Sequence, residues 1–292
     1  MTNPKVSVLM PVYNTEENYL KEAINSLLNQ TFVDFELIIC DDGSTNNVVQ
    51  IVESYQDERI CFVQNEKNLG ISASRNKLMK LAKGKYVAWA DSDDISMPSR
   101  LEKQVQFLDT HPNISVIGAW YKRTPDMLVP KLPKEVGLVD LLKWCAVAQP
   151  VTMYRKEDFD KYKLTYADSE FNVCEDLELW SRVLMSGLKI MNLQEALLEY
   201  RYHINNISHS KQELILKKTA LVKSRIVSYL SGDLNIQKAL LSMFDPSKQL
   251  MKRNICFLGV PFLQIRQKGK KKKFYLFGCL PFLKIQEKQS NA

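Results

Sequence analysis

The sequence has six cysteines but no C-x-x-C pair, and it has neither a G-x-G-x-x-G nor a Walker A motif. Without paired cysteines, a zinc ribbon and a thiol redox motif have no support, and scattered single cysteines are typical of a reducing compartment. Without a glycine-rich phosphate loop, a hydride-transferring dinucleotide enzyme and a phosphate-cradling NTPase lose their main signal. A nucleotide ligand would therefore have to be held by carboxylates and a metal ion.

Long apolar runs are also missing. No stretch reaches about 18 uninterrupted apolar residues, so a membrane-spanning helix is not expected. Residues 1–14 have no charged leader and no small-residue cleavage site, so we expect no signal peptide and a cytoplasmic location. The 292 residues are 45% hydrophobic and 25% charged, which predicts a folded core and excludes a disordered chain.

The positive charge is concentrated near the C-terminus. The formal net charge is +7, but residues 252–288 contain ten Lys or Arg and one acid, so the remainder is slightly acidic. A basic protein often binds nucleic acid. Because the charge here belongs to a tail, we expect no nucleic-acid partner.

The tail contains an internal repeat, in which FLGVPFLQIRQK (257–268) returns as FGCLPFLKIQEK (277–288) after a run of lysines. Aromatic and aliphatic residues beside lysines favour docking on an anionic membrane surface, which predicts a peripheral location on the inner face of the cell membrane. The alternative is a β-hairpin that packs on the body and exposes a turn of lysines.

Apolar runs and helical spacing alternate through the first 118 residues. We expect strands at 5–12, 35–40, 60–64, 86–90 and 114–118, with helices at 18–30, 48–55, 72–82 and 98–108 between them. This alternation predicts an α/β fold with a parallel sheet covered by helices. Later elements are expected as a loop region with a short helix at 121–150, strands at 151–154, 188–193 and 197–202, and helices at 176–186, 212–229 and 236–243.

Two acidic clusters directly follow predicted strands, one at 41–42 and the other at 91–94. Ligands of parallel sheets bind beyond the carboxyl ends of the strands, so we expect both clusters in one crevice. Three carboxylates within four residues repel one another unless a cation or hydrogen-bond donors compensate them. Such hard oxygen ligands suit Mn²⁺ or Mg²⁺ held jointly with substrate phosphates. The alternatives are a turn or helix cap at Asp42 and a merely solvated turn at 91–94.

Several of these segments together resemble the motifs of family 2 glycosyltransferases, which have the GT-A fold. They are VSVLMPVYN (6–14), DDGS (41–44), NLGISASRN (68–76), the D-x-D at 91–93, CEDLELW (174–180) and YRYHINNIS (200–208). The resemblance covers about residues 5–208 and points to bacterial enzymes that build lipopolysaccharide, lipooligosaccharide or capsule. It implies a Rossmann-like, mostly parallel central sheet flanked by helices. The expected parts are a nucleotide-sugar-binding half (1–118), an acceptor-binding and catalytic half (119–208), a helical extension (209–250) and a basic amphipathic tail (251–292).

The resemblance also implies roles for individual residues at the donor site. Pro11, Val12 and Tyr13 would line the base pocket, with the Tyr13 ring against the base. Asp42 would accept a hydrogen bond from the uracil of a UDP-linked donor. Arg75 would contact the donor, although a surface arginine is an equally good interpretation.

A metal site is implied beside the donor. Asp93 would be the direct ligand of Mn²⁺ or Mg²⁺, and Asp91 would contact the ribose or the metal shell. His203 would approach the metal or the diphosphate, unless it is a structural histidine at the end of a strand.

Catalysis is assigned to Glu175 and Asp176, because an inverting transfer needs a carboxylate that takes the proton of the acceptor hydroxyl. Asp176 is the preferred base and Glu175 would orient the acceptor; the alternative is that both only cap a helix. The predicted reaction moves a sugar from a UDP-hexose or UDP-N-acetylhexosamine to a glycan or lipid-linked oligosaccharide acceptor. Two other hypotheses are a nucleotidyltransferase, whose glycine-rich N-terminal signature is missing, and a non-catalytic membrane adaptor, which would not need all of these acids.

Overall fold

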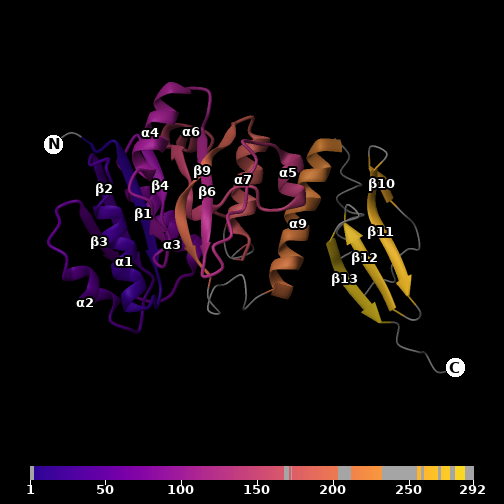
Figure 1. Cartoon of the computed structure of the whole chain (residues 1–292), viewed down its shortest axis with the longest axis horizontal. Coiled ribbons are helices and arrows are strands. Elements are labelled where there is room, and N and C mark those ends of the chain that lie inside the picture. The colour runs from indigo at the N-terminus through magenta and orange to yellow at the C-terminus, as the bar shows by residue number, and fades with distance from the viewer. Residues whose placement is uncertain are drawn as a thin grey trace. The chain divides into compact units, whose positions relative to one another are not determined.

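The computed structural model describes residues 3–167, 171, 173–202, 212–231, 255–257, 260–268, 271–276 and 280–286. The chain divides into two compact units, Met1–Ile226 and Val227–Ala292 (Figure 1). The predicted helix at 236–243 and the candidate metal ligand His203 lie outside the described residues.

The first unit begins with four parallel strands in the order β3-β2-β1-β4. Their bounds are β1 (Val6–Val12), β2 (Phe35–Asp41), β3 (Ile60–Gln64) and β4 (Tyr86–Trp89), and the connections carry α1 (Glu17–Leu28), α2 (Val48–Glu53) and α3 (Ile71–Leu81). Every residue of β1 is buried, as expected for the middle of a sheet that helices cover. One face of α1 packs against this core, because its apolar residues recur at helical spacing: Leu20, Ala23, Ile24 and Leu27. The predicted alternation of strands and helices is therefore confirmed here.

The sheet continues with strands of both directions. Beyond β4 the order is β8-β6-β9-β5, and β7 pairs with β9. Their bounds are β5 (Ile95–Ser96), β6 (Val116–Thr124), β7 (Glu135–Val136), β8 (Met153–Arg155) and β9 (Ile190–Arg201). β8 is antiparallel to both β4 and β6, whereas β6 and β9 are parallel. The helical elements of this half are α4 (Arg100–Thr110), α5 (Leu138–Lys143), the 3-10 turn η1 (Gln149–Val151), α6 (Lys156–Lys161) and α7 (Glu175–Met185), and the boundary between the two units falls within α9 (Gln212–Ser231).

Two expectations for this half are wrong. The start of the region expected as loops belongs to β6, which runs on to Thr124, and the strands expected at 188–193 and 197–202 are one strand, β9. The polar residues Gln194 and Glu195 interrupt the apolar pattern of β9. Pairing with β6 nevertheless continues past them, because register shifts on either side of Trp120 absorb the irregularity.

The second unit contains an antiparallel sheet in the order β10-β11-β12-β13. Its strands are β10 (Ile255–Phe257), β11 (Val260–Lys268), β12 (Lys271–Leu276) and β13 (Leu280–Gln286). The two copies of the sequence repeat supply β11 and β13, and both pair with β12. The β-hairpin of the alternative interpretation is formed by β11 and β12, but Lys271–Lys273 belong to β12 and not to its turn.

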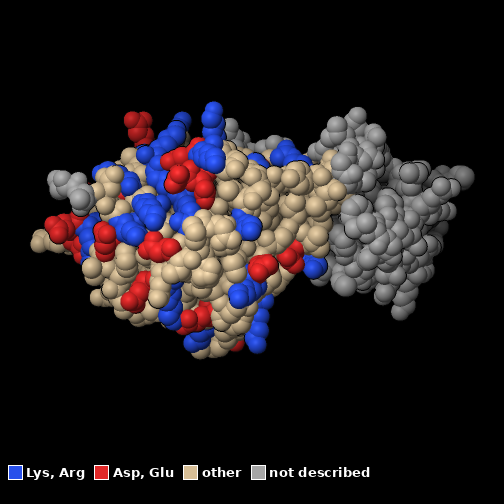
Figure 2. Space-filling view, turned by 90° about the horizontal axis from the view of Figure 1, so that it is seen from above, with Lys and Arg blue, Asp and Glu red and all other residues tan. Residues whose placement is uncertain are grey.

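The surface of the first unit carries both signs of charge. In Figure 2, basic and acidic side chains are interspersed over the face in view. Among the helices in the described ranges, none has the length and apolar character needed to cross a membrane.

Candidate active site

The candidate site lies where the parallel strands β1, β2 and β4 end. Val12 pairs with Asp41 in the parallel register of β1 and β2, and β4 runs alongside β1 in the same direction. Tyr13, Asp42 and Asp91 follow these strand ends. The two acidic segments, after β2 and after β4, therefore lie at the same edge of the sheet, as predicted.

The end of β1 presents Tyr13 to solvent. The Tyr13 side chain is 49% exposed, whereas Pro11 and Val12 are buried within the sheet. Asn14 has a left-handed backbone conformation (φ 51°), which asparagine tolerates better than most residues. Its amide donates to Ser44 Oγ (2.8 Å), and its Oδ1 accepts from the Thr45 amide (2.8 Å). These bonds fasten the loop after β1 to the loop after β2, so Tyr13 is held beside the DDGS segment.

Asp42 is buried and accepts three hydrogen bonds from the chain itself. Asn65 Nδ2 (2.8 Å) and the Leu69 amide (2.9 Å) donate to Oδ1, and the Gly70 amide (2.9 Å) donates to Oδ2. Gly70 is the N-cap residue of α3. Asp42 therefore holds the segment that leads into α3, but it does not cap a helix, because the amides of the first turn of α3 are not among its donors.

Gly43 allows this close packing of the two loops. Its φ of +72° is unfavourable for other residues, and a Cβ at this position would lie 2.6 Å from the Lys67 carbonyl carbon. The DDGS and NLG segments are therefore in direct backbone contact.

Arg75 lies in the middle of the site and is 5% exposed, so its interpretation as a surface arginine is wrong. Its guanidinium lies beside the rings of Trp89 (5.6 Å to the centroid) and Tyr166 (5.3 Å), which meet each other edge to face. It donates to Glu175 Oε1 (2.7 Å) and is 3.5 Å from Asp91 Oδ1. Burial opposes the charge of Arg75, but the neighbouring carboxylates outweigh this effect and raise its pKa. Arg75 is therefore a fixed positive charge between acids of two distant segments.

The turn after β4 holds three aspartates in a partly buried position. Burial raises the pKa of Asp91 to about 6. Repulsion from Asp93 and Asp176 adds to this shift, and attraction to Arg75 opposes it. Asp94 is 3% exposed, so the turn is not merely solvated. Burial and the neighbouring aspartates raise the pKa of Asp94 well above its usual range.

Arg201, at the end of β9, fastens this turn. Its amide donates to Asp94 Oδ1 (2.9 Å), and its guanidinium donates to the Asp93 carbonyl (3.0 Å) and pairs with Glu22. The guanidinium also lies 4.6 Å from the centroid of the Tyr19 ring. The acidic turn is therefore anchored to β9, and the YRYH segment that continues from β9 begins beside it.

Glu175 and Asp176 begin α7 and differ in their surroundings. The N-cap residue of α7 is Cys174, and both acids lie in the first turn of the helix, where the helix dipole also favours a negative charge. The Glu175 side chain is 12% exposed and paired with Arg75. Burial raises the pKa of Glu175, although Arg75 opposes the shift. Asp176 Oδ1 accepts from the Leu177 amide (2.7 Å), and Asp176 Oδ2 receives only the weak thiol donor of Cys145 (3.6 Å).

A divalent cation fits the chemistry of these donors. The carboxylates of Asp91, Asp93 and Asp94 gather around one turn, and Asp94 Oδ2 is buried without a hydrogen-bond partner in the part of the chain that the structure describes. Arg100 and the Arg201 amide compensate Asp94 in part, and its unpaired oxygen fits a further positive charge at this turn. Among the described residues, no group of three or more His, Cys, Asp or Glu side chains is arranged to hold a metal ion. The predicted set also includes His203, which is not among those residues.

Several side chains that hold the site are not among the residues predicted from the sequence. Asn76 exchanges two hydrogen bonds with the Tyr166 backbone, and Gln149 donates to the Tyr166 hydroxyl. Asn76 ends the NLGISASRN motif and Arg201 lies in YRYHINNIS, so the motifs pointed to both. No local pattern pointed to Tyr166 or Gln149.

The α/β fold and the acidic rim at its strand ends define a glycosyltransferase of the GT-A type. The model of the family described as "Glycosyl transferase family 2" matches residues 7–174, and the chain belongs to this family. This membership decides against both other hypotheses, the nucleotidyltransferase and the non-catalytic adaptor.

Relatives of the chain carry glycosyltransferase names. The putative glycosyltransferase EpsE of Bacillus subtilis (strain 168) is 33% identical over 84% of this chain and 91% of the relative. The UDP-Glc:alpha-D-GlcNAc-diphosphoundecaprenol beta-1,3-glucosyltransferase WfaP of Escherichia coli is 28% identical over 75% of this chain and 86% of the relative.

Solved structures share the fold. S. aureus TarS in complex with UDP-GlcNAc has a TM-score of 0.66 at 24% identity, covering 82% of this chain and 71% of that chain. The mannosyltransferase PcManGT from Pyrobaculum calidifontis in complex with GDP-Man and Mn²⁺ has a TM-score of 0.56 at 15% identity, covering 84% and 71%.

Proposed function

We propose that this glycosyltransferase is metal-dependent and inverting, and that it moves a hexose or N-acetylhexosamine from a UDP-linked donor to a glycan acceptor of bacterial surface polysaccharide or lipooligosaccharide. The observation that carries the proposal is the meeting of Asp91 and Glu175 at the buried Arg75, which brings the acidic turn after β4 and the start of α7 into one site. The UDP-Glc named for the Escherichia coli relative and the UDP-GlcNAc bound to TarS support a UDP-linked donor.

The donor base is proposed to bind at the ends of β1 and β2. Tyr13 supplies an exposed aromatic face, and Pro11 and Val12 position it from within the sheet. A carboxylate has about four lone-pair sites, and the chain already uses three of those on Asp42. The remaining site accepts the uracil imide proton in this proposal.

Asp91 and Asp93 are proposed to hold Mn²⁺ or Mg²⁺, with His203 as a further ligand. When bound, the cation stabilises the negative charge on the departing nucleoside diphosphate. The anchor at Arg201 keeps the backbone of Asp93 in place, and Arg75 keeps the Asp91 carboxylate oriented. The chain thus fixes the ligands before the donor arrives.

Asp176 is proposed as the catalytic base, because Glu175 is committed to its ion pair with Arg75 (2.7 Å). Asp176 Oδ2 faces only a weak thiol donor and can accept the proton of an acceptor hydroxyl. Attack from the side opposite the leaving group inverts the anomeric centre, and the sugar develops oxocarbenium character on the way. Glu175 and Arg75 then orient the acceptor side of the site.

The second unit is proposed to bring the enzyme to the inner face of the cell membrane, where a lipid-linked oligosaccharide acceptor would be found. The support is the lysine-rich strand β12 between two copies of an aromatic and aliphatic repeat.

The metal-dependent reaction can be tested without knowing the acceptor. Purified protein with Mn²⁺ and a panel of UDP-sugars should slowly release UDP, and the true donor should give the largest thermal shift by mass action. The variant Asp93→Ala should lose this release by about 100-fold or more, since it removes charge stabilisation of several kcal/mol. The matched variant Asp34→Ala, which alters an exposed aspartate before β2, should keep it. Equal release by Asp93→Ala and wild type would refute the metal-ligand assignment.

A further inference from the structure

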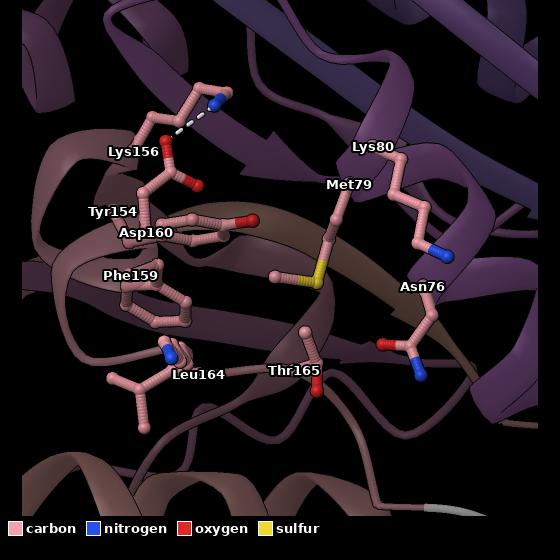
Figure 3. Close-up of a pocket in the computed structure, with 10 residues that line it drawn as sticks. Asn76, Met79, Lys80, Tyr154, Lys156, Phe159, Asp160, Leu164 and Thr165 are labelled. Atoms are coloured by element: carbon pink, nitrogen blue, oxygen red, sulfur yellow. Dashed lines mark hydrogen bonds and ion pairs between the residues drawn. The ribbon is translucent and has the colours of Figure 1, made fainter.

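A hollow of about 240 Å³ lies in the first unit, between α3, β8, α6 and residues 163–165 (Figure 3). None of the acids of the candidate active site lines it. The segment 164–166 separates the two places: Thr165 faces the hollow, and the next residue, Tyr166, packs on Arg75. This hollow is called the α3–α6 pocket below.

One wall of the α3–α6 pocket is apolar. The rings of Tyr154 and Phe159 stack with centroids 3.7 Å apart and an interplanar angle of 22°. Both residues are almost fully buried, at 1% and 2% exposure. The thioether of Met79 points at the hollow from α3 (Figure 3). A ligand with an apolar body can therefore contact this wall.

The Tyr154 hydroxyl points into the α3–α6 pocket, as Figure 3 shows. Tyr154 is 1% exposed, and among the described residues its hydroxyl has no hydrogen-bond partner. The ring is buried, but the hydroxyl lines the hollow, where it can donate a hydrogen bond to a ligand. This donor is thus held ready for a group that enters the pocket.

The rim of the α3–α6 pocket is positively charged. Lys156 is neutralised by Asp160, whose Oδ2 lies 2.5 Å from its Nζ. Lys80 and Lys163 also line the pocket, and neither has an ion pair within the described ranges. Two cationic groups and one hydroxyl donor therefore surround an apolar wall, with the only carboxylate of the lining already paired.

We propose that the α3–α6 pocket binds a phosphate-bearing ligand with an apolar body. The phosphate group pairs with Lys80 and Lys163 and accepts a hydrogen bond from the Tyr154 hydroxyl, while the body of the ligand packs on the Tyr154–Phe159 stack. The site is separate from the donor site and does not depend on the proposed transfer reaction. A soluble phosphate ester and the head group of an anionic lipid share this chemistry.

Binding can be measured with inorganic pyrophosphate and geranyl diphosphate as probes, by isothermal titration calorimetry on the full chain in EDTA and low salt. EDTA removes divalent ions and so suppresses diphosphate binding at the proposed metal site. We expect geranyl diphosphate to bind and its affinity to fall with rising salt, because exposed charges are screened. The double variant Lys80→Gln/Lys163→Gln should weaken binding about tenfold or more. The variant Tyr154→Phe, which keeps the ring stack, should weaken it about fivefold.

The matched control is Lys161→Gln, which alters an exposed lysine of α6 that does not line the pocket and should leave the affinity unchanged. Equal affinity for the two probes would overturn the contact assigned to the Tyr154–Phe159 stack, whereas a clear preference for geranyl diphosphate would support a phosphate carried on an apolar body, as in an amphiphile. The proposal is overturned if neither probe binds, or if the double lysine variant binds as tightly as the wild type. Unchanged binding by Tyr154→Phe would overturn the assignment of the hydroxyl.

Discussion

At the scale of single residues, Arg75 decides how the candidate site is arranged. Its guanidinium lies beside two aromatic rings and is paired with Glu175, and its Nε is buried without a hydrogen-bond partner among the described residues. Attraction to aromatic faces and to carboxylates offsets part of the cost of taking the charge out of water. The same contacts link α3 to α7, so the position of the acids at the start of α7 depends on this one side chain.

The variant Arg75→Ala should lower the free energy of unfolding at pH 7 by about 3–5 kcal/mol, because Glu175 remains buried without its counter-ion. Urea unfolding followed by circular dichroism measures the loss. The matched control is Arg123→Ala, which removes an exposed pair with Asp126 and should cost at most about 1 kcal/mol. Similar losses in the two variants would contradict the structural role assigned to Arg75.

The pH dependence of the same variant has a defined sign. Burial raises the pKa of Glu175 and Arg75 opposes this, so removal of Arg75 should raise the pKa further. A carboxyl group whose pKa is higher in the folded state binds its proton more tightly there, so lowering the pH stabilises the fold. The stability deficit of Arg75→Ala should therefore shrink between pH 7 and pH 5. A deficit that stays constant over this range would show that Glu175 is not the group left uncompensated.

At the scale of elements, α4 is tied to the sheet at its C-terminal end through Asp109. The Tyr86 hydroxyl donates to Asp109 (2.7 Å), and Lys5 (3.1 Å) and Lys85 (3.2 Å) pair with it. Burial alone would raise the pKa of Asp109, but these donors outweigh it and lower the pKa to about 2. One carboxylate thus joins the starts of β1 and β4 to the helix that covers them.

In the variant Asp109→Asn, the free energy of unfolding should fall less steeply than in the wild type as the pH is lowered. A carboxyl group whose pKa is lowered by folding contributes stability above its unfolded pKa of about 3.9, and this contribution is lost as the pH falls toward 2. Because the side chain is 36% exposed, solvent screening reduces the contribution to about 1 kcal/mol. Urea midpoints of the wild type and the variant at pH 6 and pH 2.5 measure the difference. Parallel acid limbs in the two proteins would contradict this role.

At the scale of the whole molecule, the net charge and the chemistry belong to different units. The candidate active site lies in the first unit, while the run of lysines and the repeat lie in the second. Lys271–Lys273 follow one another within β12, next to strands formed by the two copies of the repeat. The membrane proposal is therefore testable by changes in the second unit alone.

Replacement of Lys271, Lys272 and Lys273 by Gln in the full chain should weaken binding to vesicles that contain anionic lipid by about 100-fold, since each lysine near such a surface contributes about 1 kcal/mol. Co-sedimentation with phosphatidylcholine–phosphatidylglycerol vesicles measures this, and UDP release from the donor should stay unchanged. A control replaces three exposed lysines of the first unit, Lys83, Lys161 and Lys189. Unchanged vesicle binding by the β12 variant would remove the membrane proposal.

Local sequence patterns determined the first half of the sheet and the position of its acids. Strands β1 to β4 and helices α1 to α3 lie within a few residues of their predicted bounds, because apolar periodicity and turn residues act over short stretches of chain. The position of the acidic turns at one edge of the sheet follows from the common direction of the parallel strands. The motifs around these turns were sufficient to identify the family.

Only the tertiary structure decided which acid is available and which is paired. Arg75 and Glu175 are 100 positions apart in the chain, and no local pattern records that they meet. The same holds for the Tyr166 ring on Arg75, for the continuous pairing of β9 with β6 and for the hydroxyl of Tyr154 in the α3–α6 pocket. Burial and charge pairing depend on which distant segments the fold brings together, whereas periodicity reports only the face that each segment turns to the core.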